Sequence, residues 1–209
     1  MIDKFNIFKN RRPLIAILRG ITPLEAESVS DVLIESGINI IEVPLNSPNP
    51  FETIERMANF HGENGIFGAG TVLKEQEVSS VADAGGKIII SPNTNSLIIN
   101  KSKELNLLSF PGVFTASECF EALEAGADGL KFFPASLLKP NNFKALSAVL
   151  PDNIVSIAVG GIDEIQFPNW LEVKVTGFGL GSNLYKPGML LDEIKAKAER
   201  IVKVYDSSI

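Results

Sequence analysis

Short apolar segments recur along the whole chain, separated by longer stretches whose apolar residues have helical spacing. Eight of these segments are rich in Ile, Val and Leu, and they cover Leu14–Leu18, Ile38–Val43, Ile66–Ala69, Lys87–Ile90, Leu107–Phe110, Gly129–Phe133, Ile154–Val159 and Val175–Leu180. They start about 20 to 28 residues apart, the length of one strand, one helix and two short loops. Strands that are apolar throughout are typical of a parallel sheet covered on both faces.

The stretches between these strands carry helix start and stop signals. Thr22 and Glu25 have the spacing of a capping box, and Gly37 follows as a stop signal. The same start signal recurs at 115–118, and residues 1–12 are predicted to form a leading helix. Eight such units predict a single α/β domain over residues 1–209, a (β/α)8 TIM barrel with an N-terminal helix. A doubly wound open sheet is the alternative, but its G-x-G-x-x-G turn is missing after the first strand.

Lys131 is an unusual residue in a predicted strand because every neighbour in that strand is apolar or glycine. In TIM barrels the chemistry lies at the carboxyl ends of the strands, and Lys131 lies near such an end. A lysine can extend to solvent from an edge strand, but a closed barrel has no edge strands. Burial would lower the pKa of the amine, and a neutral amine can attack a carbonyl carbon.

Glu42 and Arg19 are the other ionisable residues at the predicted strand ends. Glu42 interrupts the second apolar strand, where it is either a general acid/base with a raised pKa or a structural partner for a cation. Arg19 closes the first strand. A guanidinium there suits a carboxylate or a phosphate, and an ion pair with Glu42 is the alternative.

Glycine-rich turns follow the last two predicted strands, at Gly160-Gly161 and at Gly181-Ser182. Glycines allow the backbone to approach a phosphate closely, and these two turns are where TIM barrels commonly bind one. Considered singly, the hydroxyls of Thr71 and Ser182 suit helix capping better than substrate binding.

Composition excludes several classes of protein and site. The chain has 19 Lys and Arg against 25 Asp and Glu, a net charge of −6, and no basic run longer than Arg11-Arg12, so we expect no nucleic-acid partner. Cys119 is the only cysteine and His61 the only histidine, so disulfides, thiolate clusters and multi-histidine zinc sites are excluded. The apolar runs are too short for a membrane span or a signal sequence. We therefore expect a cytoplasmic protein without metal or cofactor.

These residues together indicate imine chemistry on a phosphorylated keto compound. A desolvated lysine would condense with the ketone, a carboxylate would move protons, and the arginine and the glycine turns would hold anionic groups. Two other classes remain open. One is a phosphate-binding barrel isomerase or decarboxylase in which Lys131 forms no imine, and the other is a sugar-phosphate binder without activity.

The order of motifs resembles the 2-keto-3-deoxy-6-phosphogluconate/galactonate aldolases from about residue 12 to the C-terminus. The motifs are LIAILRGIT at 14–22, IEVPLNSP at 41–48, GAGTVL at 68–73, SPN at 91–93, FPGVFTASE at 110–118, LKFFPAS at 130–136, AVGGI at 158–162 and GLGSNLY at 179–185. The resemblance implies a class I aldolase on a (β/α)8 barrel, usually a homotrimer, that reversibly releases pyruvate and glyceraldehyde 3-phosphate from a phosphorylated keto sugar acid.

The resemblance also implies residue roles. Lys131 would form the Schiff base and Glu42 would act as general acid/base through a water, while Arg19 and Thr71 would hold the pyruvoyl end. The remaining substrate-binding residues that it implies are Pro92, Phe133, Gly160, Gly161, Gly181 and Ser182.

Two positions distinguish the branches of this family. Gluconate-type members commonly read T-L-R-T after the glutamate and T-G-G before the phosphate turn, where this chain has Pro44-Leu45-Asn46-Ser47 and Val159-Gly160-Gly161. The pattern is similar to the galactonate branch, whose substrate is the C4 epimer. Replacing a hydroxyl by an isopropyl group changes which C4 hydroxyl can be held. Activity on the gluconate epimer or on 4-hydroxy-2-oxoglutarate is the alternative.

Overall fold

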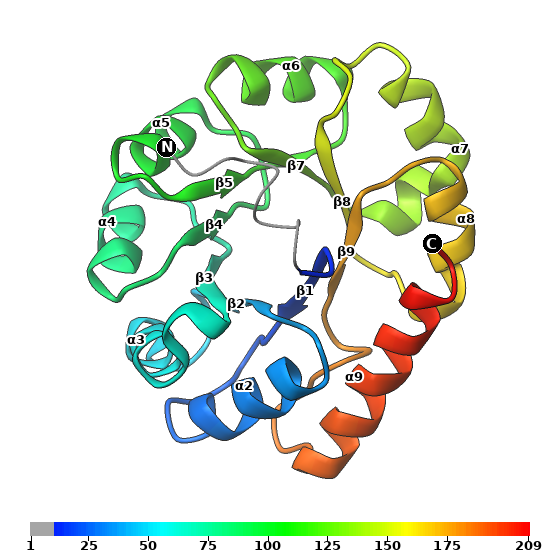
Figure 1. Cartoon of the computed structure of the whole chain (residues 1–209). Helices are drawn as coiled ribbons and strands as arrows, with labels where there is room; N and C mark the ends of the chain where they lie inside the picture. The colour runs from blue at the N-terminus through cyan, green and yellow to red at the C-terminus, as the bar shows by residue number, and fades with distance from the viewer. Residues whose placement is uncertain (1–10) are drawn as a thin grey trace.

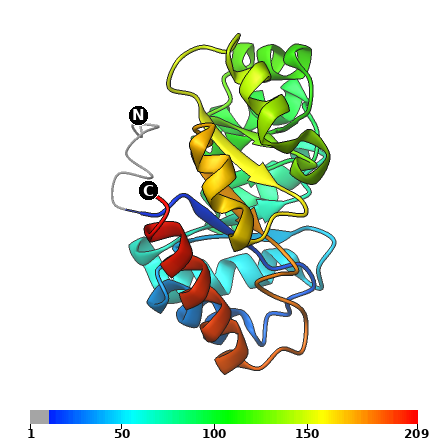
Figure 2. The same cartoon turned by 90° about the vertical axis from the view of Figure 1, so that its right-hand side faces the viewer.

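The computed structural model describes residues 11–209, so the leading helix predicted for residues 1–12 lies outside the described residues except for its last two positions. The strands form a ring around one axis, and helices surround that ring (Figure 1; side view in Figure 2). The strands are β1 Leu14–Ile17, β2 Ile40–Pro44, β3 Ile66–Gly70, β4 Ile88–Ile90, β5 Leu108–Phe110, β6 Gly112–Val113, β7 Gly129–Phe132, β8 Val155–Val159 and β9 Gly177–Leu180.

All strand pairs are parallel, and the order is β5-β4-β3-β2-β1-β9-β8-β7-β6. Every predicted apolar segment forms a strand, and the predicted (β/α)8 barrel is confirmed. The additional strand arises because Pro111 interrupts the fifth barrel strand, so β5 pairs with β4 and β6 pairs with β7. The Pro111 carbonyl still accepts the Lys131 N–H at 2.9 Å, which joins the two halves of the strand to β7.

Helices follow the strands around the barrel. They are α2 Ala26–Glu35, α3 Pro50–His61, α4 Glu75–Asp83, α5 Ser96–Glu104, α6 Ala116–Glu124, α7 Ala135–Ser147, α8 Phe167–Glu172 and α9 Leu191–Asp206, with short 3-10 turns η1 Gly62–Asn64 and η2 Glu164–Gln166. Within residues 11–209, none of them combines the length and the apolar composition that a membrane span needs.

The predicted helix signals lie at helix ends as expected, except that the first start signal precedes its helix by one turn. Thr115 and Glu118 form a complete capping box on α6. The Glu25 carboxylate accepts the backbone N–H of Thr22 at 3.1 Å and its hydroxyl at 2.6 Å, but α2 begins only after Glu25. That signal therefore closes the turn before the helix. Gly37 ends the element with φ of 93°, a conformation that favours glycine.

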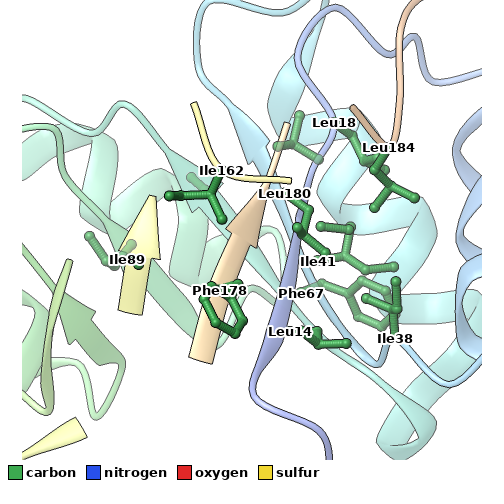
Figure 3. Packing of buried hydrophobic residues seen from close by; sticks show 14 of the residues in the cluster. Leu14, Leu18, Ile38, Ile41, Phe67, Ile89, Ile162, Phe178, Leu180 and Leu184 are labelled. Carbon is green, nitrogen blue, oxygen red and sulfur yellow. The ribbon is translucent and has the colours of Figure 1, made fainter. Parts of the chain in front are cut away.

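The strands separate two apolar layers because their side chains alternate between the two faces. An outer layer packs between strands and helices and includes Leu14, Ile41 and Phe178 (Figure 3). An inner layer fills the barrel and includes Ile15 of β1 and Ile40 of β2. On each strand, every second side chain therefore faces the barrel interior. The last of these lie at the carboxyl end of the barrel, where the candidate site is.

Candidate active site

The inward positions change from apolar to polar as each strand approaches its carboxyl end. On β1 the inward residue Ile17 is followed two positions later by Arg19, and on β2 Ile40 is followed by Glu42. On β7 the inward position is Lys131, which pairs in register with Gly112 and Ile157. The apolar interior of the barrel therefore forms the floor below these charged groups.

A cavity of about 710 Å³ opens above this floor. All the residues predicted for the site line it, namely Arg19, Glu42, Thr71, Pro92, Lys131, Phe133, Gly160, Gly161, Gly181 and Ser182. The structure thus brings every one of them together, while the chemical role of each stays a prediction. The cavity wall also includes Asp163, Asn183, Tyr185 and Lys186, none of which stands out in the sequence.

Lys131 is buried, with 7% of its surface exposed. Desolvation lowers the pKa of its amine, the charge of Glu42 raises it, and the charge of Arg19 lowers it further. The net direction is downward, toward a neutral amine. Nζ lies 5.0 Å from the centroid of the Phe133 ring, so an aromatic face covers one side of the amine.

Glu42 is almost completely buried, at 2% exposed, and its Oε2 has no hydrogen-bond partner among the described residues. Desolvation raises its pKa to about 7, although the charges of Lys131 and Arg19 pull it down. Gly70 at the end of β3 makes room for this carboxylate, because a Cβ built on Gly70 would lie 1.8 Å from Oε2. Glu42 thus has a proton affinity suited to acid–base work near neutral pH.

Arg19 is exposed at the rim, and its Nη1 donates to Oδ1 of Asn46 at 2.5 Å. Within residues 11–209, no ion pair joins Arg19 to Glu42. The alternative prediction, an ion pair between these two residues, is therefore wrong. The guanidinium still influences both buried groups through its charge. It is therefore available to an anion in the cavity.

The hydroxyl residues and the glycine turns occupy the rest of the wall. Thr71 has a φ of 60°, uncommon for a residue with a Cβ, and neither Thr71 nor Ser182 caps a helix, because α4 is capped at Lys74 and α9 at Leu190. The helix-capping alternative for both hydroxyls is therefore wrong.

Gly160 and Gly161 both have left-handed backbones, with φ of 95° and 72°. A Cβ on Gly160 would meet the Phe133 ring at 2.9 Å, and one on Gly161 would meet Ser136 at 2.8 Å. A Cβ on Gly181, by contrast, would point into open space. The 160–161 turn therefore requires glycine, whereas the turn at Gly181 has open space beside its backbone. Both leave room for a phosphate to approach the backbone.

His61 is remote from this chemistry. It is buried at the end of α3, with Nε2 2.8 Å from the Ser30 hydroxyl, and it does not line the cavity. Among the described residues, no three Asp, Glu, His or Cys side chains are placed to share a metal ion.

Comparison with known proteins gives consistent matches. Residues 6–203 match the family described as "Aldolase: KDPG and KHG aldolase". This assignment covers nearly all of the chain. The chain belongs to the KDPG and KHG aldolase family.

Two curated members of this family are similar over their whole lengths. The probable 2-dehydro-3-deoxy-6-phosphogalactonate aldolase of Rhizobium meliloti (strain 1021) is 44% identical, covering 99% of this chain and 97% of the relative. The 2-dehydro-3-deoxy-6-phosphogalactonate aldolase of Escherichia coli (strain K12) is 40% identical, covering 97% and 98%. The predicted resemblance and the prediction of an aldolase, a carbon–carbon lyase, are thereby confirmed.

Two solved structures match the same barrel. One is described as the native KDPGal structure, with a TM-score of 0.94, 40% identity and coverage of 96% of this chain and 97% of that one. The other is the KDPG aldolase from Legionella pneumophila with pyruvate captured as a covalent carbinolamine. Its TM-score is 0.79, at 26% identity and 94% coverage of each chain.

Two contributions to this aldolase site were missed in the sequence. Gly70 appears in the sequence only as part of the GAGTVL motif, yet it provides the space that Glu42 occupies. Asn183 and Tyr185 lie in the GLGSNLY motif, in which the sequence gives a role only to Gly181 and Ser182. The order of residues in a motif does not say which side chains face the cavity, so only the β9–α9 turn geometry identifies them.

Proposed function

We propose that this chain is a class I aldolase that reversibly cleaves 2-dehydro-3-deoxy-6-phosphogalactonate to pyruvate and D-glyceraldehyde 3-phosphate. The observation that carries the proposal is the pairing of two buried groups at the cavity floor. Lys131 has a lowered pKa, and Glu42 has a pKa of about 7 and an unpartnered oxygen. A neutral amine and a carboxylate able to exchange a proton near pH 7 are what imine formation and aldol cleavage require.

The reaction begins at Lys131. The neutral Nζ attacks the C2 carbonyl of the substrate to form a carbinolamine, and loss of water then gives a protonated imine. The L. pneumophila relative, in which pyruvate is held as a covalent carbinolamine, supports this first step. Burial favours it as well, because an amine in water at neutral pH is protonated and has no lone pair to donate.

Cleavage uses the imine as an electron sink. Glu42, directly or through a water, takes the proton of the C4 hydroxyl, the C3–C4 bond breaks, and its electron pair moves toward the imine nitrogen to form an enamine. Glyceraldehyde 3-phosphate leaves at this point. Protonation of C3 and hydrolysis of the new imine then release pyruvate and restore the amine of Lys131.

The remaining residues of the proposed site bind the substrate. Arg19 and Thr71 hold the carboxylate of the pyruvoyl end, and the turns at 160–161 and 181–182 hold the phosphate through their backbone. Pro92 and Phe133 form the apolar wall that excludes water from the amine.

The choice of the galactonate epimer is supported by Val159, which lines the cavity beside the phosphate turn. The names of the two closely similar curated relatives point the same way. Cleavage of the gluconate epimer or of 4-hydroxy-2-oxoglutarate is the second candidate, favoured by the breadth of the family description.

Trapping of an imine is the experiment that tests the proposal. We expect incubation with pyruvate and borohydride, followed by peptide mass spectrometry, to show a reduced pyruvyl adduct on the peptide containing Lys131. The two C4 epimers are then compared as substrates, and we expect a higher kcat/KM for the galactonate epimer. Folded protein without an adduct would overturn the imine and favour an isomerase or a binder, and a higher kcat/KM for the gluconate epimer would overturn the branch assignment.

Assembly and location are part of the same proposal. We infer the homotrimer that the family resemblance implies. Large apolar side chains from three successive barrel units are exposed and offer a surface for its interfaces, namely Leu73, Leu97, Phe114 and Phe120, at 40% to 58%. A cytoplasmic location suits the single cysteine, Cys119, which is buried and free.

A further inference from the structure

The loop after β2 contacts the loop after β1 at two consecutive residues on each side. Asn46 Oδ1 accepts from Arg19 Nη1 at 2.5 Å, and the Ser47 hydroxyl accepts the backbone N–H of Gly20 at 2.9 Å. The loop after β2 thus binds the side chain of one residue and the backbone of the next. We call these four residues, Arg19, Gly20, Asn46 and Ser47, the β1–β2 clamp.

The clamp is supported from both sides by the barrel. Ser47 N–H donates to the Pro44 carbonyl at 2.9 Å, which fixes the turn at the end of β2. Gly20 has φ of 85°, and a Cβ built on it would lie 2.7 Å from Cγ of Pro187 in the loop after β9. The backbone that carries Arg19 is therefore held between two neighbouring loops, and only its long side chain retains freedom.

Asn46 does not line the cavity, whereas Arg19 does. Its effect on a substrate must therefore pass through the guanidinium. Arg19 is exposed, and an exposed arginine loses considerable rotamer freedom when it binds a ligand in one orientation. An acceptor side chain that already binds one N–H of the guanidinium reduces the rotamer freedom lost on ligand binding. The other N–H groups stay free to bind a carboxylate.

We propose that Asn46 is a positioning residue that orients Arg19 toward the carboxylate of the keto acid, and so sets substrate affinity rather than the rate of bond cleavage. This inference rests on the proposed function. In this chain the cation comes from the neighbouring strand, and the residue after β2 provides the acceptor that holds it.

The test measures two properties of Asn46→Ala. In steady-state cleavage of the phosphorylated keto acid we expect KM to rise about 10-fold, with kcat within about 3-fold of the original. In borohydride trapping we expect the pyruvate concentration that gives half-maximal adduct to rise by a similar factor. A merely structural effect would move the thermal midpoint instead, and we expect that midpoint to shift by less than about 2 °C, since Asn46 is exposed.

A double-mutant cycle with Arg19→Ala decides whether the effect passes through Arg19. Once Arg19 is removed, we expect Asn46→Ala to change KM by less than about 2-fold. Asn93→Ala is the matched control, because Asn93 is an exposed asparagine after another strand and does not line the cavity. We expect its KM and its trapping curve to equal those of the original protein.

The outcomes separate this inference from the proposed function. If the original protein forms no adduct with pyruvate and cleaves neither epimer, both are overturned. If it forms the adduct and turns over, but Asn46→Ala has an unchanged KM, the positioning role alone is overturned. A rise in KM that persists in the Arg19→Ala background also overturns it, because the effect would not pass through Arg19.

Discussion

Two pairs of a lysine and a buried carboxylate meet at β7, and they differ in how well their groups are satisfied. Just before β7, Asp128 accepts the backbone N–H of Ser109 at 2.9 Å and forms a short ion pair with Lys103. Within β7, Lys131 faces the cavity with Glu42, but no hydrogen bond between described residues joins them, and Glu42 Oε2 has no partner. One pair is saturated with hydrogen bonds, and the other is not.

This difference shows how the same residue types serve different purposes around one strand. A buried charge that is fully paired stabilises the fold or is neutral to it, and it has no capacity left for a ligand. A buried charge without partners costs free energy of folding, and such groups gather at sites that act on a substrate. Both carboxylates are buried, so the hydrogen bonds that they accept, rather than their burial or charge, distinguish the structural pair from the candidate catalytic pair.

Removing the two lysines should separate the pairs most sharply. We expect Lys131→Met to lower kcat by at least about 10⁴-fold and to abolish the pyruvate adduct, because no amine remains to form the imine. Lys103→Met should leave kcat within about 2-fold but lower the free energy of unfolding by about 1–3 kcal/mol, since Asp128 loses its cationic partner. Cleavage assays and denaturant unfolding of both variants measure the contrast. Substantial turnover by folded Lys131→Met would contradict the imine.

Removing the two carboxylate charges should have a smaller effect on activity. We expect Glu42→Gln to lower kcat/KM by about 10²–10⁴-fold, because it removes the group that accepts the C4 hydroxyl proton. In the original protein kcat/KM should rise with pH through the Glu42 pKa of about 7, since the ionised form is the base.

Glu42→Gln should lack that acidic limb, whereas Asp128→Asn should keep it. Both profiles come from initial rates measured between pH 5 and 9. An unchanged acidic limb in Glu42→Gln would assign the titration to another group and would remove Glu42 as the base.

The barrel could be predicted from the sequence because its strands are apolar throughout and recur at regular spacing. Each such strand depends on residues that are close together in the chain. Pro111 shows where this reasoning stopped, since the effect of a missing N–H on pairing depends on which strands are neighbours. Lys131 and Glu42 could be predicted because a charged residue within an apolar strand can be recognised from the order of residues alone.

The acceptor of Arg19 could not be predicted, although Asn46 was already noted as a branch difference. Its partner is 27 residues away, and whether Arg19 binds Asn46 or Glu42 depends on loop geometry. The same holds for Gly70, whose importance lies in the 1.8 Å that would separate its missing Cβ from Glu42 Oε2. Contacts between the loops of adjacent strands depend on how the closed barrel places those loops. They therefore cannot be predicted from the spacing of residues along the chain.

The smallest expected effect concerns stability, and its sign differs between the two carboxylates. Folding raises the Glu42 pKa to about 7 from the ordinary 4.5, so Glu42 stabilises the fold only while it is protonated. That contribution is complete below about pH 4.5 and is lost as the pH rises through 7, up to about 3 kcal/mol by linkage. Glu42→Gln removes this loss, although it also removes the attraction of Glu42 for Lys131.

We therefore expect Glu42→Gln to lie within about 1 kcal/mol of the original protein in unfolding free energy at pH 5 and to exceed it by about 1–3 kcal/mol at pH 8. Asp128→Asn should be less stable than the original at both pH values, because it weakens a saturated pair. Urea unfolding at the two pH values measures all three proteins. A Glu42→Gln variant that is less stable at pH 8 would mean that Glu42 serves as a structural partner of Lys131, and the contrast between the two pairs of β7 would disappear.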